Sequence, residues 1–331
     1  MSGKRTLSFK CAVHHREYGP VLGPPKGLFK RMVHMVAIEV LPDERDRKYY
    51  ADRYTCCPPP LFLILITLVE LGFFTYYTIT TGEAQATGPV PIDSIFIYRP
   101  DKRHELWRFL LYMVLHAGWL HLCFNLAVQL AVGLPLEMVH GSSRVAAVYL
   151  AGVLAGSAGS SVFDPEVCLV GASGGVYALL AAHLANVMLN YASMQHGIAR
   201  VLLIFAFASC DVGFAVYSRY ASTAGSLDVE ATPPVSYVAH LTGALAGLTI
   251  GLLVLKNFEQ KLHEQLLWWV ALGVYAACTL FALLFNLLNT VKVQSLEMEL
   301  MSDGHRFGFG DPSDPNGGSV LTKRLFASYG V

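Results

Sequence analysis

Residues 235–255 read VSYVAHLTGALAGLTIGLLVL, a stretch without a single Asp, Glu, Lys or Arg. A helix rises about 1.5 Å per residue, so about 20 residues span the roughly 30 Å of hydrocarbon in a bilayer. The only ionisable side chain, apart from the Tyr237 phenol, is His240, and a histidine at that depth is costly unless it has a partner or a purpose. The stretch predicts a membrane-spanning helix that carries a buried functional group.

Six further apolar stretches have a similar length. They cover approximately residues 61–81, 118–139, 145–163, 170–189, 198–217 and 266–288. Charged residues make up only 15% of the 331 positions, against about 25% in soluble domains, which argues against a soluble enzyme. We therefore predict an all-α, polytopic membrane protein with a six-helix core and a C-terminal seventh transmembrane helix.

The remaining segments divide the chain into three regions. Residues 1–57 form a charged N-terminal region, 58–256 a six-helix core with a long polar connection at 82–108, and 257–331 the seventh helix and a flexible tail. Lys and Arg in the N-terminal region and the turns at Arg144, Arg200 and Lys256 fall on one side, which predicts a cytosolic N-terminus. The formal net charge is zero, so we expect no nucleic-acid partner.

Polar residues gather near the starts of the second, fourth and sixth predicted helices, which run in the same direction. They are His116, His121 and Asn125 in the second helix, Gly171, Ser173 and Gly174 in the fourth, and His240 in the sixth. Polar groups inside a bilayer usually face a partner or a water-filled cavity, so three sets at one depth predict a shared pocket. Its reactive groups would be a serine and a histidine.

Local features favour Ser173 as a nucleophile. It lies where a loop enters a helix, so unpaired backbone N–H groups are available to an anion beside it, and the flanking glycines leave room for a substrate backbone. Tyr177 is one turn further on and is placed to pack against a histidine from another helix. Gly243 and Gly247 have the four-residue spacing that lets two membrane helices approach closely.

Two more motifs complete the pattern. Glu105-Leu-Trp107-Arg108 precedes the second helix, and Glu137 lies at its inner end. Together with the Gly171-x-Ser173-Gly174 motif and the histidine helix, they resemble the rhomboid intramembrane serine proteases over residues 58–256. A seventh helix after the core is similar to the arrangement in secretory-pathway members, found in the Golgi or plasma membrane.

The resemblance implies a Ser173–His240 catalytic dyad in which Tyr177 orients the imidazole. It implies an oxyanion hole formed by His121, the Asn125 amide and the Ser173 backbone N–H, with Gly171 and Gly174 as supporting residues. Neither a cofactor nor a metal ion is expected. The implied partners are lipids and single-pass transmembrane substrates such as growth-factor precursors, cut near the outer side of the bilayer, and the sequence does not define an oligomeric state.

Structural roles remain open for several of these residues. His116, Glu137, Trp107 and Arg108 are interpreted as structural, the last two as parts of a loop in the outer leaflet or as an interfacial anchor. His121 and Asn125 also suit interhelical hydrogen bonding without a catalytic part. Two other acids lie in apolar stretches, Asp211 and Glu70, and the sequence offers no account of Glu70.

Other function classes are not excluded by the sequence. A catalytically inactive rhomboid-like protein that binds membrane clients is the main alternative, although Ser173 and His240 are both present. A transporter or proton relay also uses buried His and Glu, but no inverted repeat is visible. A metalloprotease fits less well, because His116 and His121 are five residues apart and not the four that place two ligands on one helical face.

Overall fold

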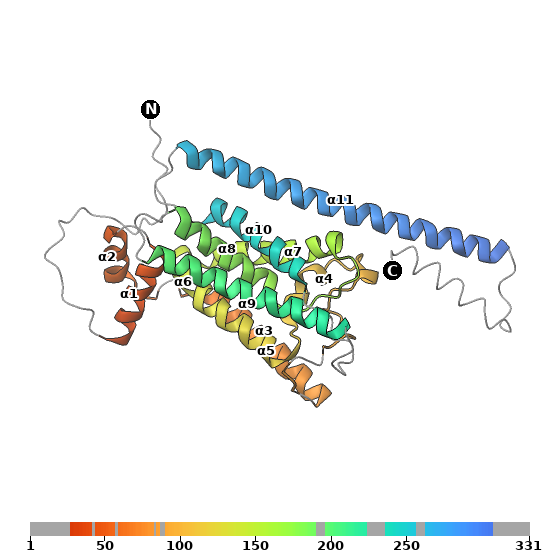
Figure 1. Ribbon diagram of the computed structural model, residues 1–331, viewed down its shortest axis with the longest axis horizontal. Helices are drawn as coiled ribbons and strands as arrows, with labels where there is room; N and C mark the ends of the chain where they lie inside the picture. Colours follow the sequence, from red (N-terminus) through yellow and green to blue (C-terminus); the bar gives the residue numbers. More distant parts are fainter. Residues whose placement is uncertain are drawn as a thin grey trace.

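The protein was analysed as a computed structural model, which describes residues 27–41, 44–56, 59–82, 84–86, 90–189, 196–223, 236–255 and 262–306. Within these residues the chain is helical, and a lone bridge between Tyr98 and Leu169 takes the place of a sheet (Figure 1). Five helical segments are long and apolar enough to cross a membrane. The predicted all-α, polytopic membrane fold is confirmed.

The helices follow the predicted apolar stretches. The five segments that qualify are α3 (Leu61–Thr81), the continuous unit of α5 (Gly118–Val128), η3 (Gln129–Gly133) and α6 (Leu134–His140), α7 (Ser142–Phe163), α10 (Tyr237–Val254) and the Leu266–Lys292 part of α11 (Leu262–Arg306). α8 (Ser173–Leu189) is a shorter apolar helix in the fourth stretch, and α9 (Gly197–Thr223) occupies the fifth.

Shorter helices lie outside these spans. The N-terminal region contains α1 (Leu28–Val40) and α2 (Glu44–Arg53), and the long connection contains η1 (Pro100–Lys102), α4 (Arg108–Leu111) and η2 (Tyr112–Val114). α11 has 45 residues and continues well past the predicted end at residue 288, because residues 291–301 are rich in good helix formers. The predicted tail beyond residue 306 and residues 1–26 lie outside the described residues.

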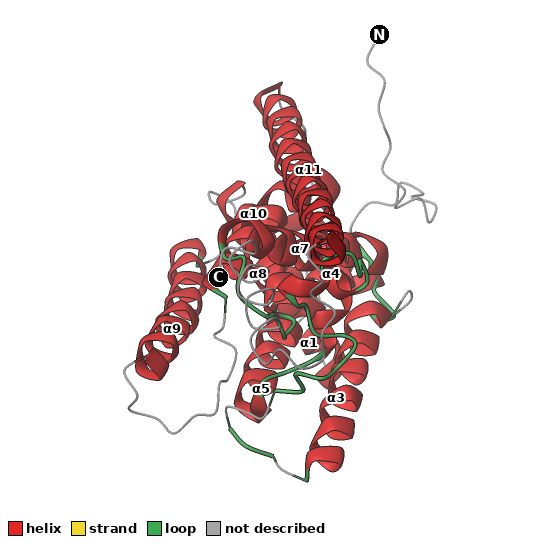
Figure 2. Cartoon of the chain, turned by 90° about the vertical axis from the view of Figure 1, so that its right-hand side faces the viewer, coloured by secondary structure: helices red, strands yellow, loops and turns green. Residues whose placement is uncertain are grey.

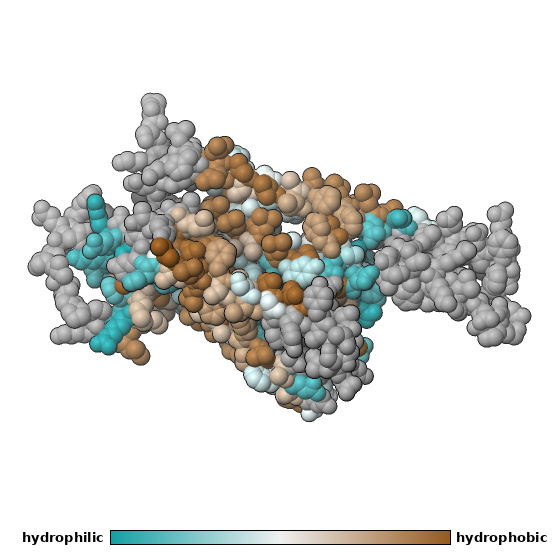
Figure 3. Space-filling view, viewed as in Figure 1, coloured by the Kyte–Doolittle hydropathy of each residue, from teal (hydrophilic) through white to brown (hydrophobic). Residues whose placement is uncertain are grey.

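The bundle helices lie roughly along the long axis of the molecule, with α1 and α2 at one end and α4 at the other (Figure 1). Seen from the side, α8 lies inside the bundle, whereas α9 and α11 lie on its outside (Figure 2). Apolar surface covers the middle of the visible face, and hydrophilic surface gathers at both ends (Figure 3). This distribution fits a bundle whose long axis crosses the membrane.

Close packing around α8 depends on glycines of its two neighbours. A Cβ at Gly243 of α10 would collide with the backbone of Gly174, and one at Gly247 would collide with that of Ala178. On the α7 side, Gly152 meets the same two residues of α8. Small residues therefore bring three helices together, as is typical of membrane bundles. The sequence analysis identified the α10 glycines and missed the one in α7.

A buried polar network joins α3 to α7 through the π-helical segment η3. The Glu70 carboxylate accepts hydrogen bonds from the Tyr149 hydroxyl at 2.9 Å and the Gln129 amide at 3.1 Å. The same amide donates to the Thr67 hydroxyl at 2.9 Å. Buried polar groups are stable in a membrane only when they are paired, and here they hold three segments together. This accounts for Glu70, for which the sequence offered no role.

We expect Glu70→Ala to lower the unfolding free energy by about 2–3 kcal/mol, because it leaves a buried amide hydrogen unpaired and opens a cavity. The melting temperature (Tm) in detergent should fall by about 5–10 °C. Glu70→Gln keeps the volume and an acceptor oxygen, so its Tm should stay within about 3 °C of wild type. Equal Tm values for the two variants would contradict this role.

Glu137 fastens the C-terminal end of the second span to the start of α3. Its carboxylate accepts the backbone N–H groups of Phe62 at 2.7 Å and Leu63 at 2.9 Å, and it also accepts the Ser142 hydroxyl. A carboxylate at a helix N-terminus satisfies N–H groups that have no partner within the helix and interacts favourably with the helix dipole.

The N-terminal helix α1 is docked onto the core. Its buried residues recur at helical spacing, Val33, Val36, Ala37 and Val40, and face α6 and α8. Beside them the Glu39 carboxylate lies 3.2 Å from both His183 of α8 and Arg200 of α9. The hydrogen bond with His183 and the charge of Arg200 lower the pKa of Glu39. Helix α1 therefore contacts α8, which begins at Ser173, and α9, the next helix along the chain.

Candidate active site

Ser173 is the first residue of α8, and the loop before it is held from two sides. The backbone of Leu169 pairs with that of Tyr98 in the outer connection, with N···O distances of 3.0 and 3.2 Å. The Gly171 N–H donates to the Tyr112 carbonyl at 3.1 Å, and Gly171 has φ +109°, a conformation that favours glycine. These contacts fix where the helix begins, and in its first turn the N–H groups of Gly175 and Val176 donate to the Ala172 carbonyl at 2.9 and 3.1 Å.

His240 lies in the first turn of α10 and is 2% exposed. Ser236 precedes this helix, accepts the Ala239 N–H at 3.3 Å and contacts the Ser160 hydroxyl of α7 at 3.0 Å. The imidazole stacks on the Tyr177 ring, with centroids 4.4 Å apart and planes 13° from parallel. The sequence analysis expected Tyr177 to pack against a histidine of another helix, and the two rings lie in that arrangement.

The contact between Gly174 and Gly243 brings the two helices together beside the candidate dyad. Ser173 directly precedes Gly174, and His240 lies one turn before Gly243. Ser173 is also largely buried, at 8% exposure. Neither imidazole nitrogen of His240 has an aligned hydrogen-bond partner within the described residues, so the Ser173 hydroxyl is not hydrogen-bonded to the imidazole. Hydrogen bonds of catalytic groups are often long or misaligned before substrate binds.

His121 and Asn125 of α5 reach the same place. A Cβ at Gly171 would collide with the His121 ring, so this ring packs directly on the loop two residues before Ser173. The Asn125 amide is buried and donates to the His121 carbonyl at 2.8 Å, which leaves its second N–H available. Helix α5 thus brings the His121 ring beside the loop that leads into Ser173. That Asn125 shares a pocket with Ser173 and His240 stays a prediction.

Asp211 of α9 is a site residue to which the sequence analysis gave no role. One carboxylate oxygen, Oδ2, accepts the Tyr177 hydroxyl at 2.9 Å and lies 3.2 Å from His240 Nδ1. The signal was present in the sequence, since an acid within an apolar stretch marks a functional site by default. What the sequence did not reveal was which helix faces it.

The other predicted residues surround this centre. The His116 ring is buried beside His121, with centroids 5.3 Å apart. Arg108 is buried as well and ties the outer connection together, donating to Glu105 at 2.6 Å and to the carbonyls of Ser94 and Ile97. Trp107 is 50% exposed and donates to the Ile95 carbonyl at 3.2 Å. These hydrogen bonds hold together the connection between α3 and α5.

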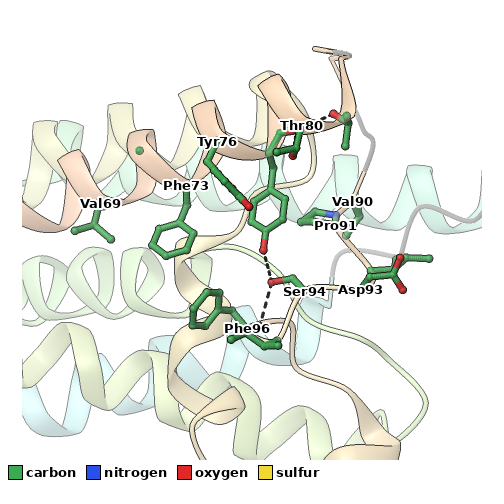
Figure 4. A pocket seen from close by; sticks show the side chains of 14 residues that line it. Val69, Phe73, Tyr76, Thr80, Val90, Pro91, Asp93, Ser94 and Phe96 are labelled. Atoms are coloured by element: carbon green, nitrogen blue, oxygen red, sulfur yellow. Dashed lines mark hydrogen bonds between the residues drawn. The ribbon is translucent and has the colours of Figure 1, made fainter.

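A cavity of about 930 Å³ lies away from these residues. It is formed by the outer half of α3 and the segment around residues 90–96, where Tyr77 donates to the Ser94 hydroxyl (Figure 4). None of the candidate catalytic residues lines it. Among the described residues, no group of three His, Cys, Asp or Glu side chains is arranged to hold a metal ion. The chemistry available at the site is that of a hydroxyl, imidazoles, an amide and a carboxylate.

Comparison with known proteins gives consistent matches. Residues 103–257 match the family model described as Rhomboid domain. The chain is 43% identical over 296 residues to Rhomboid-related protein 3 of Homo sapiens, covering 87% of this chain and 72% of that protein. It is 44% identical over 263 residues to Rhomboid-related protein 2 of Mus musculus, covering 78% and 84%. Inactive rhomboid-related protein 2 of Caenorhabditis elegans is 35% identical over 221 residues, covering 66% and 61%.

Proposed function

Since this chain belongs to the rhomboid family, we propose that it is an intramembrane serine endopeptidase that works through Ser173 and His240. The observation that supports this most directly is the packing of α10 on α8. The Gly174–Gly243 contact and the Tyr177 ring hold the imidazole beside the first turn of α8, where Ser173 lies. A serine hydroxyl becomes a useful nucleophile only when a base is held at this range.

In the proposed reaction, the Ser173 oxygen attacks the scissile carbonyl carbon while its proton passes to His240. The carbonyl π electrons move to the oxygen, and the resulting oxyanion accepts hydrogen bonds from the Ser173 N–H, the Asn125 amide and His121. Each such donor is worth about 3 kcal/mol in the transition state. His240 then protonates the leaving amine, and water hydrolyses the acyl-enzyme.

The proposed substrates are single-pass transmembrane proteins, including growth-factor precursors, cut near a small residue in the outer part of the bilayer. An amide within an intact helix is hydrogen-bonded and shielded, so helix-breaking residues near the cleavage site should help. We further propose that residues 1–57 face the cytosol and that the protein resides in the Golgi or plasma membrane. Arg144 and Arg200, together with the Lys and Arg residues of the N-terminal region, support this orientation.

A fluorophosphonate probe tests the nucleophile directly, because it phosphonylates an activated serine. Wild-type protein in detergent or proteoliposomes should be labelled, and Ser173→Ala should not. Ser143→Ala is a matched control, since Ser143 is exposed at the inner start of α7 and should leave labelling unchanged. Labelling of Ser173→Ala at the wild-type rate would rule out this serine as the nucleophile.

One observation favours a second candidate, a catalytically inactive protein that binds membrane clients. His240 has no aligned hydrogen bond within the described residues, and one relative is named as inactive. Wild-type protein that resists the probe and retains a membrane client equally well with and without the Ser173 hydroxyl would support this role.

Gly171 offers a test of the loop before the nucleophile. Gly171→Ala introduces a Cβ against the His121 ring and strains a backbone with φ +109°, so the oxyanion donors should shift. We expect kcat for a membrane reporter to fall at least tenfold, and the unfolding free energy to fall by about 1–3 kcal/mol. Unchanged kcat would show that this loop does not set the oxyanion geometry.

A further inference from the structure

Asp211 of α9 lies beside two rings of the candidate site, the Tyr177 phenol and the His240 imidazole. Asp211 Oδ2 accepts the Tyr177 hydroxyl at 2.9 Å. It also lies 3.2 Å from His240 Nδ1, which is within ion-pair range although Nδ1 is not aligned for a hydrogen bond in this structure. We propose that Asp211 is a positioning residue for His240, so that the site works as a Ser173–His240–Asp211 triad. This inference rests on the proposed function of Ser173 and His240.

The Tyr177 hydroxyl alone does not explain the carboxylate. That hydroxyl also donates, at 3.2 Å, to the backbone carbonyl of Ala208, which lies on α9 like Asp211. A backbone carbonyl accepts this hydrogen bond without placing a charge in the membrane. An acid at membrane depth is costly, and a hydroxyl that has a backbone acceptor within reach does not need one. The imidazole is the neighbour that gains from a negative charge, because a carboxylate beside Nδ1 stabilises the imidazolium more than a neutral acceptor does.

Tyr177 and Asp211 restrain different properties of His240. The stacked phenol ring fixes the plane of the imidazole, with 13° between the two planes. A ring stack does not determine which nitrogen carries the proton. A carboxylate oxygen beside Nδ1 does, because it favours a proton on Nδ1 and leaves the lone pair on Nε2 to accept the proton of Ser173. In this proposal the proton moves only between the serine oxygen, Nε2 and the leaving amine, and Asp211 does not take it up.

The position of Asp211 on an outer helix adds a consequence. α9 lies on the outside of the bundle, beside α8 and α10, and several of its apolar side chains are exposed, among them Leu202, Leu203 and Phe205 (Figure 2). Ser173 and His240, by contrast, are joined by the glycine contacts of α8 and α10. The base is therefore fully oriented only while α9 stays against the site.

The test compares full-length wild type, Asp211→Asn and the neighbouring control Cys210→Ala, whose side chain is exposed on α9. Asp211→Asn keeps the shape and removes the charge. We expect kcat for a membrane reporter to fall at least tenfold with KM within about twofold, since the loss concerns the base and not substrate binding. Cys210→Ala should retain wild-type kcat.

Nitrogen NMR of histidine-labelled protein supplies a readout that a structural role would not change. The chain has 12 histidines, and the His240 signal is identified by its loss in His240→Ala. We expect the His240 proton on Nδ1 in wild type and on Nε2 in Asp211→Asn. Tyr177→Phe keeps the ring stack, so it should preserve the tautomer and lower kcat less than Asp211→Asn does.

The outcomes separate the two proposals. Wild-type kcat in Asp211→Asn, or an unchanged His240 tautomer, would overturn the role of Asp211 while leaving the dyad intact. A wild-type protein that neither cleaves the reporter nor reacts with the fluorophosphonate would overturn the proposed function, and with it the triad.

Discussion

Replacing Ser173 or His240 by Ala is expected to abolish cleavage of a co-expressed single-pass membrane reporter. The loss should be at least about 10³-fold in kcat/KM, because a nucleophile without its base, or a base without its nucleophile, retains only the contribution of the oxyanion donors. The two substitutions remove parts of one unit, so the double variant should be no less active than either single variant. Immunoblots of the released fragment measure this.

Two controls keep this result specific. Ser143→Ala and His104→Ala remove the same side chains at exposed positions and should leave cleavage within about twofold of wild type. Equal membrane insertion of all variants, measured by carbonate extraction, shows that the chain still folds into the bilayer. Cleavage by Ser173→Ala at more than about a tenth of the wild-type rate would end the assignment of the nucleophile.

The second large expected effect is a loss of stability when one methyl group is added at Gly247. Gly247→Ala places a Cβ against the Ala178 backbone, where α10 and α8 approach most closely. Overpacking of this kind costs about 1–3 kcal/mol, and here it would push the His240 helix away from the Ser173 helix. We expect Tm to fall by about 5–10 °C and cleavage to fall with it.

Gly273→Ala on α11 is the matched control, because nothing lies within 4 Å of a Cβ at that position. Ala is a better helix former than Gly by about 1 kcal/mol, so this variant should be as stable as wild type or slightly more stable. The two Gly→Ala changes therefore have opposite predicted signs. A Tm for Gly247→Ala at or above that of Gly273→Ala would show that α8 and α10 can move apart at this contact without loss of stability.

The sequence predicted the parts of the fold that depend on apolar length. Each apolar stretch became a helix, because backbone groups in a bilayer must be paired within the segment. The sequence also predicted a shared pocket for Ser173, His240, His121 and Asn125, because they lie near the starts of helices that run in the same direction, and this stays a prediction. Helix α1 was not predicted, although Val33, Val36, Ala37 and Val40 recur at helical spacing, because this segment is too short to span a membrane.

Contacts between helices were harder to predict. Glu70 and Asp211 were recognised as acids in apolar stretches, but their partners Gln129, Tyr149 and His240 lie on other helices. Sequence periodicity gives the faces of a helix and not the rotation of its neighbours, so pairings of this kind follow from packing. The close approach of Gly152 to α8 was missed for the same reason.

The docking of α1 has a practical consequence for work with shortened chains. A version that begins after residue 41 would lose the carboxylate that lies between His183 and Arg200, and it would uncover the apolar surface that Val36 and Val40 now occupy. Both basic groups belong to helices of the core, His183 to α8 and Arg200 to α9. Shortened chains designed to isolate that core should therefore keep residues 28–41, because loss of activity in a chain without them would reflect a folding defect and not regulation.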